Sequence, residues 1–257
     1  MNTTARSVGI VTIIDHGNFG NRLQNFALQE SIRALGFDVE TIRNTPRGGD
    51  GAGPTRRRIE MFRRRGLRAF TDKARLIVAQ ERSSEPVDRG LLERIKGNLQ
   101  FTHDHVREHD RAFAEIRDIG AFAAAHDYFV VGSDQVWNPL FRLLNEIDFL
   151  TFAQKQQRIS YAASIGVTEL SKYERRRYAS LIGGIPAISV REFDSARIVR
   201  ELTGRLAPVV LDPTMLVSIS DWRGMATVPD GLRERGYVLK FFLGDVDQRR
   251  LEPFDNY

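Results

Sequence analysis

The first 42 residues limit the fold most strongly, because an apolar run passes at once into a glycine loop and an amphipathic segment. Val8 to Ile14 reads VGIVTII and predicts a fully buried strand. After the loop, apolar residues recur at helical spacing from about Asn21 to Leu35, and Gly36 is placed to end that helix. Phe37 to Ile42 then alternates as a second strand. A strand, helix, strand unit of this kind builds a parallel sheet with a right-handed crossover.

The same alternation of strand and helix continues along the chain. Further strands are expected in YFVVG at 128–132, RISYAASIG at 158–166, PAISVRE at 186–192 and PVVLDPT at 208–214. Helices are expected at 73–81, 89–98, 111–125, 171–182 and 194–202. The pattern predicts an α/β fold with an open, mostly parallel, Rossmann-like sheet. Polar residues at the carboxyl ends of its strands should converge on one ligand crevice.

Two segments interrupt this pattern and set the expected domain organisation. We predict one Rossmann-like domain at 7–230, with a basic helical insertion at 47–82 that opens on a Gly/Pro-rich stretch. Residues 231–257 are interpreted as a linker and the first strand, GYVLKFFLG, of an incomplete second domain. Because a lone strand cannot bury itself, this strand either joins the existing sheet or belongs to a second domain that the chain carries only in part.

The net charge of +5 and the pI near 9.7 come from one segment. Residues 47–82 hold eleven Lys and Arg against four Asp and Glu, so the rest of the chain is slightly acidic. The aromatic residues are not interleaved with these basic residues, which argues against a nucleic-acid partner. Arg56 to Arg68 has the composition of a basic helix on an anionic membrane surface, or of a solvated insertion with ion pairs along its face.

Composition excludes several other classes of protein. No apolar run approaches the roughly 18 residues of a membrane-spanning helix, and MNTTARSVGIV lacks the order of a signal peptide. A cytoplasmic location is therefore expected, with the inner face of the membrane as the place where Arg56 to Arg68 would act. Without cysteine there is no disulfide, thiolate zinc site or cysteine nucleophile. His103, His105 and His109 have no matching carboxylate pattern, so no metal site is predicted.

Five blocks of sequence, in order, carry a resemblance to a known family. They are GNFGNRLQNFALQ at 17–29, YFVVGSDQVWNP at 128–139, RISYAASIG at 158–166, ISVREFDS at 188–195 and VLDPTML at 210–216. On these blocks, of which GSDQVWN is the most distinctive, the chain resembles the polysaccharide pyruvyl transferase family. The resemblance implies a two-domain fold similar to GT-B glycosyltransferases, of which these residues would form the N-terminal half.

The resemblance also implies a reaction. The enolpyruvyl group of phosphoenolpyruvate, the donor substrate, would be transferred to two hydroxyls of a sugar in a surface or exported polysaccharide, often on a lipid-linked acceptor, to give a pyruvate ketal. No cofactor is implied. Family members usually continue well beyond Gly244 and carry part of the donor site there, so activity is expected once a second half is supplied. The alternatives are a truncated, non-catalytic sugar-binding module and a nucleotide-sugar GT-B glycosyltransferase.

Ketal formation needs cations for the donor's phosphate and carboxylate, an acid for its methylene carbon and a base for the hydroxyls. Arg22 and Arg191 are the candidate cations, because a guanidinium pairs bidentately with either anion. Arg22 is alternatively an exposed helix residue, and Arg191 alternatively pairs with Glu192. Asp134, after a buried strand, is the candidate base, or alternatively a loop carboxylate that caps the backbone of 135–137. His16, beside the glycine loop, is the candidate acid.

The remaining candidates would bind the substrate. Gly17 and Gly20 spell neither GxGxxG nor a P-loop, but they allow the loop to seat an anion or a sugar. Sugar hydroxyls are expected to contact Asn18, Asn21, Ser133 and Ser164, although Asn21 is alternatively a helix cap.

Two further residues stand near the predicted crevice and have structural alternatives. Trp137 either stacks on a sugar ring or packs in the core, and the core is the commoner environment. Asp212 in LDPT is expected to hold the turn before Pro213.

Overall fold

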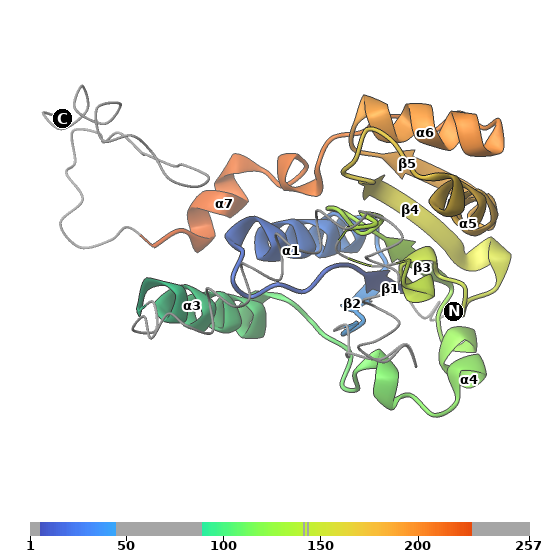
Figure 1. Ribbon diagram of the computed structural model, residues 1–257. Coiled ribbons are helices and arrows are strands. Elements are labelled where there is room, and N and C mark those ends of the chain that lie inside the picture. Colours follow the sequence, from blue (N-terminus) through green and yellow to red (C-terminus); the bar gives the residue numbers. More distant parts are fainter. Residues whose placement is uncertain (1–5, 45–88, 141, 143, 228–257) are drawn as a thin grey trace, which may run out of the picture. The chain divides into compact units, whose positions relative to one another are not determined.

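The computed structural model describes residues 6–44, 89–140, 142 and 144–227 (Figure 1). The chain divides into two compact units, Met1–Val217 and Ser218–Tyr257. The first unit contains a five-stranded sheet in the order β2-β1-β3-β4-β5, and every neighbouring pair of strands is parallel. The predicted α/β fold with an open parallel sheet is therefore confirmed. In the second unit, Ser218 caps helix α7 (Ile219–Met225) by accepting a hydrogen bond from the Asp221 amide.

The elements of the first unit follow the alternation seen in the sequence. The strands are β1 (Ser7–Val11), β2 (Asp38–Thr41), β3 (Tyr128–Val131), β4 (Arg158–Ala163) and β5 (Ala187–Val190). The α-helices are α1 (Phe19–Ala34), α3 (Arg89–His105), α4 (Ile119–Ala124), α5 (Lys172–Gly183) and α6 (Phe193–Thr203). The described residues of this unit also contain four 3-10 helices: η1 (Phe113–Glu115), η2 (Glu146–Phe149), η3 (Lys155–Gln157) and η4 (Pro213–Met215).

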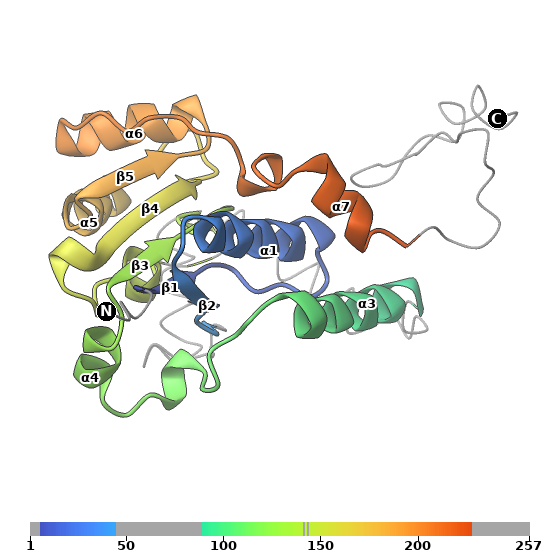
Figure 2. The ribbon, with the colours of Figure 1, turned by 180° about the vertical axis from the view of Figure 1, so that it is seen from behind.

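Both faces of the sheet are covered, because side chains of the central strands β1 and β3 alternate between two hydrophobic clusters. On one face, Ile10 and Val130 pack with Leu28 of α1. On the other face, Val11 and Val131 join the larger cluster that contains Ile182 of α5. Helix α5 packs against α6, and Figure 2 shows this pair beside β4 and β5. The carboxyl ends of the strands are thus left as the edge that can hold a ligand.

One glycine in β1 allows the close packing of the central strands. A Cβ atom on Gly9 would lie 2.8 Å from two ring carbons of Phe129, which is shorter than real Cβ contacts. Phe129 is fully buried and occupies the position next to Gly9 on β3. The glycine therefore lets a large aromatic ring fill the centre of the sheet.

The predicted strand at 208–214 is wrong. Only Val209 bridges to Val190, and the chain then turns into η4. Pro208 and Pro213 bracket this segment and have no N–H to donate to a strand ladder. Asp212 accepts a hydrogen bond from the Thr214 amide and so begins the turn, as the LDPT pattern predicts.

The predicted helix at 111–125 is divided. Its first half contains only the short turn η1, and a separate helix, α4, begins after Asp118. The Asp118 side chain accepts from the Ala121 amide at 2.9 Å, so it acts as an N-cap within the sequence expected to be continuous helix.

Several predictions fall on residues outside those described. They are the insertion at 47–82 with its helix at 73–81, the membrane contact through Arg56 to Arg68, and the second-domain start at 231–257. Within the residues that are described, no helix is both long enough and apolar enough to cross a bilayer.

Candidate functional site

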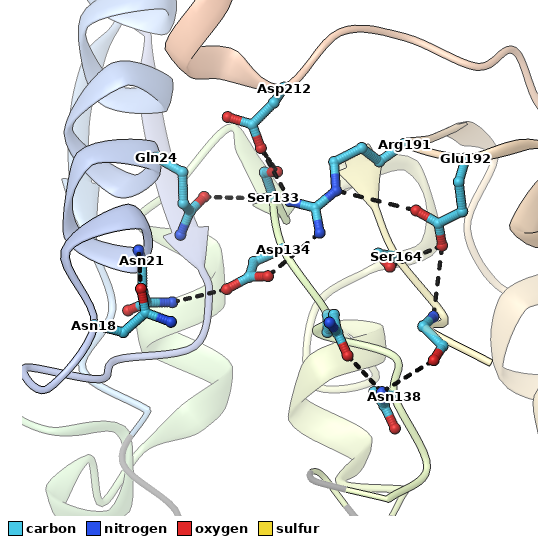
Figure 3. A network of polar contacts seen from close by, with 12 residues as sticks. Asn18, Asn21, Gln24, Ser133, Asp134, Asn138, Ser164, Arg191, Glu192 and Asp212 are labelled. Carbon is cyan, nitrogen blue, oxygen red and sulfur yellow. Dashed lines mark hydrogen bonds and ion pairs between the residues drawn. The ribbon is translucent and has the colours of Figure 1, made fainter. Parts of the chain in front are cut away.

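The candidate site lies where the order of the sheet reverses. From β1 the chain passes to β2 on one side, and β3 pairs with the opposite side of β1. In open α/β sheets such a switch point leaves a crevice at the carboxyl ends of the two strands. Residues from the start of α1 and from the loop after β3 meet there (Figure 3). Sequence reasoning placed candidates on both segments, and the structure brings Asn21 and Asp134 into contact.

The start of α1 is fixed by its own side chains. Asn18 is the N-cap and accepts from the Asn21 amide at 3.2 Å, so the cap is Asn18 rather than Asn21. The Asn21 side chain instead donates through Nδ2 to Asp134 Oδ2 at 3.1 Å. Gly17 is half-buried, with its amide bonded to Asp15, and Gly20 is exposed in the first turn. The loop therefore directs a buried asparagine amide at the Asp134 carboxylate.

Arg22 is fully buried, so its alternative as an exposed helix residue is wrong. As the candidate cation it has no surface open to a ligand in this structure. Its Nη2 donates to the Ile13 carbonyl at 2.8 Å, and Nε and Nη2 donate to Asn21 Oδ1 at 3.1 and 2.5 Å. Burial lowers its pKa to about 10, although the charges of Glu108, Asp15 and Asp134 oppose this decrease. Arg22 is thus still a cation at neutral pH, and it orients the Asn21 amide.

Asp134 occupies the centre of the network. Its side chain is 23% exposed and accepts from Asn21 at Oδ2 and from Arg191 Nη2 at Oδ1, the latter at 3.4 Å. Its backbone has φ 69°, a left-handed conformation that is uncommon outside glycine and tolerated by aspartate. The Asp134 carbonyl accepts from the amides of Ser164 and Val136, which hold this conformation. Such over-determined backbone is typical of functional sites.

Arg191 is shared between carboxylates. Its Nη1 donates to Asp212 Oδ2 at 3.1 Å, and its Nε lies 4.0 Å from Glu192 Oε2. The predicted Glu192 ion pair is therefore present but is the longest of the three that Arg191 makes in the described part of the chain. The guanidinium connects the loop after β3 to the segment that follows the Val209 bridge.

Asp212 anchors Arg191 more than it binds a ligand. Its Oδ1 accepts from the Thr214 amide and hydroxyl, and its Oδ2 accepts from Ser133 and Arg191. Burial alone would raise the pKa of Asp212, but the hydrogen bonds from Thr214, Ser133 and Arg191 hold it below its ordinary value. Four accepted bonds fill about all the lone-pair positions of a carboxylate. Asp212 is thus a fixed anion within the site.

Gln24 positions the loop after β3, and sequence reasoning missed it. Its Oε1 accepts from the Ser133 amide at 3.1 Å, while its Nε2 donates to Thr12 at 3.0 Å. Gly132 precedes this point with φ 128°, and a Cβ there would lie 2.0 Å from the Tyr161 carbonyl, so only glycine fits. The signal available in the sequence was the spacing of Gln24 one helical turn after Asn21, on the same face of α1.

Ser133 and Ser164 are buried and bonded to other protein groups. The Ser133 hydroxyl donates to Asp212 at 2.9 Å. The Ser164 hydroxyl donates to Glu192 Oε1 at 2.7 Å, and the same carboxylate accepts from the Ser195 hydroxyl. The two serines hold the Asp212 and Glu192 carboxylates in place. Like Gln24, Glu192 is a site residue that the sequence did not identify as one; it was expected only as an ion-pair partner of Arg191.

Trp137 belongs to the core, so its predicted stacking on a sugar is wrong and its structural alternative is confirmed. The residue is fully buried, its ring stacks on Phe149 at 5.7 Å, and its indole N–H donates to the Asp148 carbonyl at 2.8 Å. The side chain has no face toward the crevice.

His16 lies in a different groove. This groove has a volume of about 840 Å³ beside α3, and its lining includes Arg43, Lys96 and Glu108. Burial and the charge of Arg22 lower the pKa of His16, although Asp15 opposes the decrease, so the neutral ring is favoured at neutral pH. A general acid would begin the reaction protonated, and this environment works against that state.

A second hollow adjoins Arg191 directly. Its volume is about 510 Å³, and its lining consists of Tyr161, Arg191, Val209–Asp212 and Leu216. The Tyr161 hydroxyl donates to the Leu211 carbonyl at 3.1 Å. This hollow is called the Tyr161 pocket below. An aromatic ring thus does line the site, although it is not the one that the sequence suggested.

Comparison with known proteins assigns the chain to a family. The family model described as polysaccharide pyruvyl transferase matches residues 18–249, most of the chain. The chain belongs to the polysaccharide pyruvyl transferase family. No curated protein and no solved structure matches it. The five sequence blocks that carried the resemblance all overlap the matched range.

Membership of the polysaccharide pyruvyl transferase family implies a polysaccharide acceptor, and the polar groups of the crevice are of a kind that binds one. Asp134 and Arg191 offer a partly exposed carboxylate and guanidinium, and the buried Asn21 amide holds the Asp134 carboxylate. Among the described residues, no group of three His, Asp or Glu side chains could hold a metal ion.

Proposed function

We propose that this chain transfers the enolpyruvyl group of phosphoenolpyruvate to two hydroxyls of an acceptor sugar, and that the crevice at Asp134 holds the acceptor. The observation that carries the proposal is the contact between Asp134 and Arg191. Each oxygen of Asp134 accepts one bond from the protein, which leaves about two of its acceptor positions open. Arg191 likewise keeps N–H groups beyond those directed at Asp134 and Asp212. A sugar hydroxyl is both donor and acceptor, so it fits beside this pair.

The proposed reaction balances as an addition followed by a displacement. One hydroxyl oxygen adds to C2 of phosphoenolpyruvate while C3 accepts a proton. The second hydroxyl oxygen then displaces inorganic phosphate from the same carbon, and a cyclic ketal results. Asp134 takes the proton of the hydroxyl that it contacts, which is the role of a general base. Arg191 and Asn21 hold the carboxylate in position.

The charge of this crevice favours binding of the neutral acceptor sugar over binding of the anionic donor. Arg191 is surrounded by the carboxylates of Asp134, Asp212 and Glu192, so the cluster is net negative. Phosphoenolpyruvate carries a phosphate and a carboxylate, and like charges at close range are costly. Arg22 is buried and bonded to Asn21. Neither Arg22 nor Arg191 is therefore available to bind an anion. We assign the phosphate and the carboxylate of the donor to other cations.

The test is a transfer assay on the purified chain. Phosphoenolpyruvate is mixed with a panel of methyl glycosides, and phosphate release is measured together with the mass of the sugar product. We expect a product that has gained one pyruvate less one water, from the chain alone or once a second half of the enzyme is supplied. Nucleoside diphosphate sugars are supplied in a parallel arm. Glycosyl transfer in that arm, with no reaction of phosphoenolpyruvate, would replace the proposal by the glycosyltransferase alternative, and sugar binding without turnover would replace it by the binding-module alternative.

A further inference from the structure

The Tyr161 pocket is preformed. The Tyr161 hydroxyl is bonded to the Leu211 carbonyl, and the Val210 amide donates to the Val190 carbonyl at 2.9 Å. The Leu216 amide donates to the Pro213 carbonyl at 2.9 Å within η4. Each wall is thus tied to the sheet or to a turn, and preformed pockets with a few polar groups are the usual form of small-molecule sites.

The polar atoms of this pocket are mostly occupied by the protein itself. Asp212 already accepts four hydrogen bonds. The Tyr161 hydroxyl is used by Leu211, and burial together with the charge of Asp212 raises the pKa of Tyr161, so the phenol stays protonated and donating. Arg191 is the one lining side chain among the described residues that still offers charged N–H groups. The side chains of Val209, Val210, Leu211 and Leu216 offer a ligand apolar surface.

That apolar surface is open rather than packed. Leu211 is 61% exposed and Leu216 is 49% exposed, and both stand in the lining beside the Tyr161 ring. The pocket therefore has an apolar rim and a charged group, the Arg191 guanidinium. A ligand that fits it has an apolar part and a polar part in the same arrangement. A sugar that carries a methyl group has this division, because its hydroxyls are polar and the methyl of an N-acetyl or 6-deoxy group is not.

We propose that the Tyr161 pocket binds a methyl-bearing substituent of the acceptor sugar, so that the site prefers N-acetylated or 6-deoxy acceptors to the parent hexoses. The inference rests on the proposed function, which places the acceptor hydroxyls at Asp134 and Arg191. Arg191 belongs both to the network and to the pocket lining. A sugar whose hydroxyls bind at the network therefore has the pocket beside it. Burial of one methyl group corresponds to a preference of about fourfold.

Binding can be measured without turnover. Saturation-transfer NMR is recorded on the chain with matched pairs of methyl glycosides, such as N-acetylglucosamine with glucose and fucose with galactose. We expect the methyl protons of the N-acetyl or 6-deoxy group to receive the most saturation. We also expect the methyl-bearing member of at least one pair to bind about fourfold more tightly than its parent.

Two leucine variants provide the matched comparison. Leu211→Ser replaces an exposed pocket residue and should abolish the preference, so that the methyl-bearing sugar and its parent bind with equal affinity. Leu206→Ser changes a leucine that is 77% exposed and lies outside the pocket lining, and it should leave the preference intact. Because both leucines are exposed, both variants are expected to fold.

The outcomes separate this inference from the proposed function. Equal affinities within every pair, an effect of Leu206→Ser equal to that of Leu211→Ser, or no sugar binding at all would overturn the preference. Equal affinities combined with pyruvyl transfer would leave the proposed function in place. A methyl preference that depends on Leu211, in a chain that never consumes phosphoenolpyruvate, would support the pocket and reject the proposed reaction.

Discussion

The Asp134 crevice and the groove beside α3 border the same helix start, yet they differ in how their polar atoms are satisfied. In the crevice, Asp134, Arg191 and Asp212 are joined by hydrogen bonds and ion pairs. In the groove, buried polar atoms of His16 and Glu108 have no hydrogen-bond partner among the described residues. Arg22 lies between the two, with Nε and Nη2 bonded to Asn21 and Nη1 without such a partner.

The difference shows which region is prepared for chemistry. A connected network holds its carboxylate and guanidinium in fixed positions, so the groups that remain open can meet a substrate without rearrangement. The buried polar atoms of His16 and Glu108 are not fixed in this way by hydrogen bonds within the described residues. We therefore expect substitutions in the crevice to change transfer, and substitutions in the groove to change mainly stability.

The largest effect is expected for Asp134→Asn. The amide keeps the shape of the side chain but cannot take a proton, so the rate of pyruvyl transfer should fall by about 100-fold or more. The control is Asp194→Asn, which changes an exposed carboxylate of α6 that pairs only with Arg197 among the described residues. Transfer by Asp134→Asn at the rate of the Asp194→Asn control would remove Asp134 from the mechanism.

A smaller effect is expected for Asp212→Asn. The neutral side chain loses the charge that anchors Arg191 and leaves one of the donors from Ser133 or Thr214 poorly paired. We expect the free energy of unfolding to decrease by about 1 to 3 kcal/mol. The rate of transfer should fall less than for Asp134→Asn, because Arg191 keeps its contact with Asp134. Denaturant unfolding measures the stability and the transfer assay measures the rate. A larger loss of rate for Asp212→Asn than for Asp134→Asn would make Asp212 the base and Asp134 the anchor of Arg191.

The smallest effect on transfer is expected for Glu108→Gln in the groove, where the rate should stay within about twofold of wild type. A loss comparable to that of Asp134→Asn would show that the groove, and not only the crevice, takes part in the reaction.

The same variant has a predicted pH dependence of stability. Burial raises the pKa of Glu108 above its ordinary value of 4.5, although the charges of Arg22 and Arg43 oppose the increase. The folded chain therefore holds this proton more tightly than the unfolded chain, and its stability falls as the pH rises through 4.5 and above. Because Gln does not ionise, the stability of Glu108→Gln relative to wild type should increase between about pH 4 and pH 7. A difference that is constant with pH would contradict the assignment.

The sequence predicted the parallel sheet because its signal is local. Each buried strand is a short apolar run, and the polar residues that follow β1 and β3 did converge on one crevice. The strand predicted at 208–214 failed because its prolines remove ladder donors. The helix predicted at 111–125 failed because Asp118 can cap a helix from inside the pattern.

The partners of the site residues could not be predicted in the same way. Nothing local indicates that the arginine of the glycine loop is buried, since Arg22 owes its position to the Ile13 carbonyl and the Asn21 side chain. Trp137 is placed in the core by its packing against Phe149, and Tyr161, which the sequence did not single out, is oriented by the Leu211 carbonyl. Such pairings are set by tertiary contacts and leave no periodic signal.

The most direct test of the central claim is a pair of titrations on wild type and Arg191→Gln. An acceptor glycoside and phosphoenolpyruvate are each titrated into both proteins by calorimetry, with thermal unfolding as the check on folding. If the crevice holds the acceptor, Arg191→Gln weakens the acceptor by about tenfold or more, as for a lost hydrogen bond to a charged group, and changes the affinity for phosphoenolpyruvate by less than about twofold. Weaker binding of phosphoenolpyruvate with unchanged binding of the acceptor would contradict the account and make Arg191 a donor-site cation.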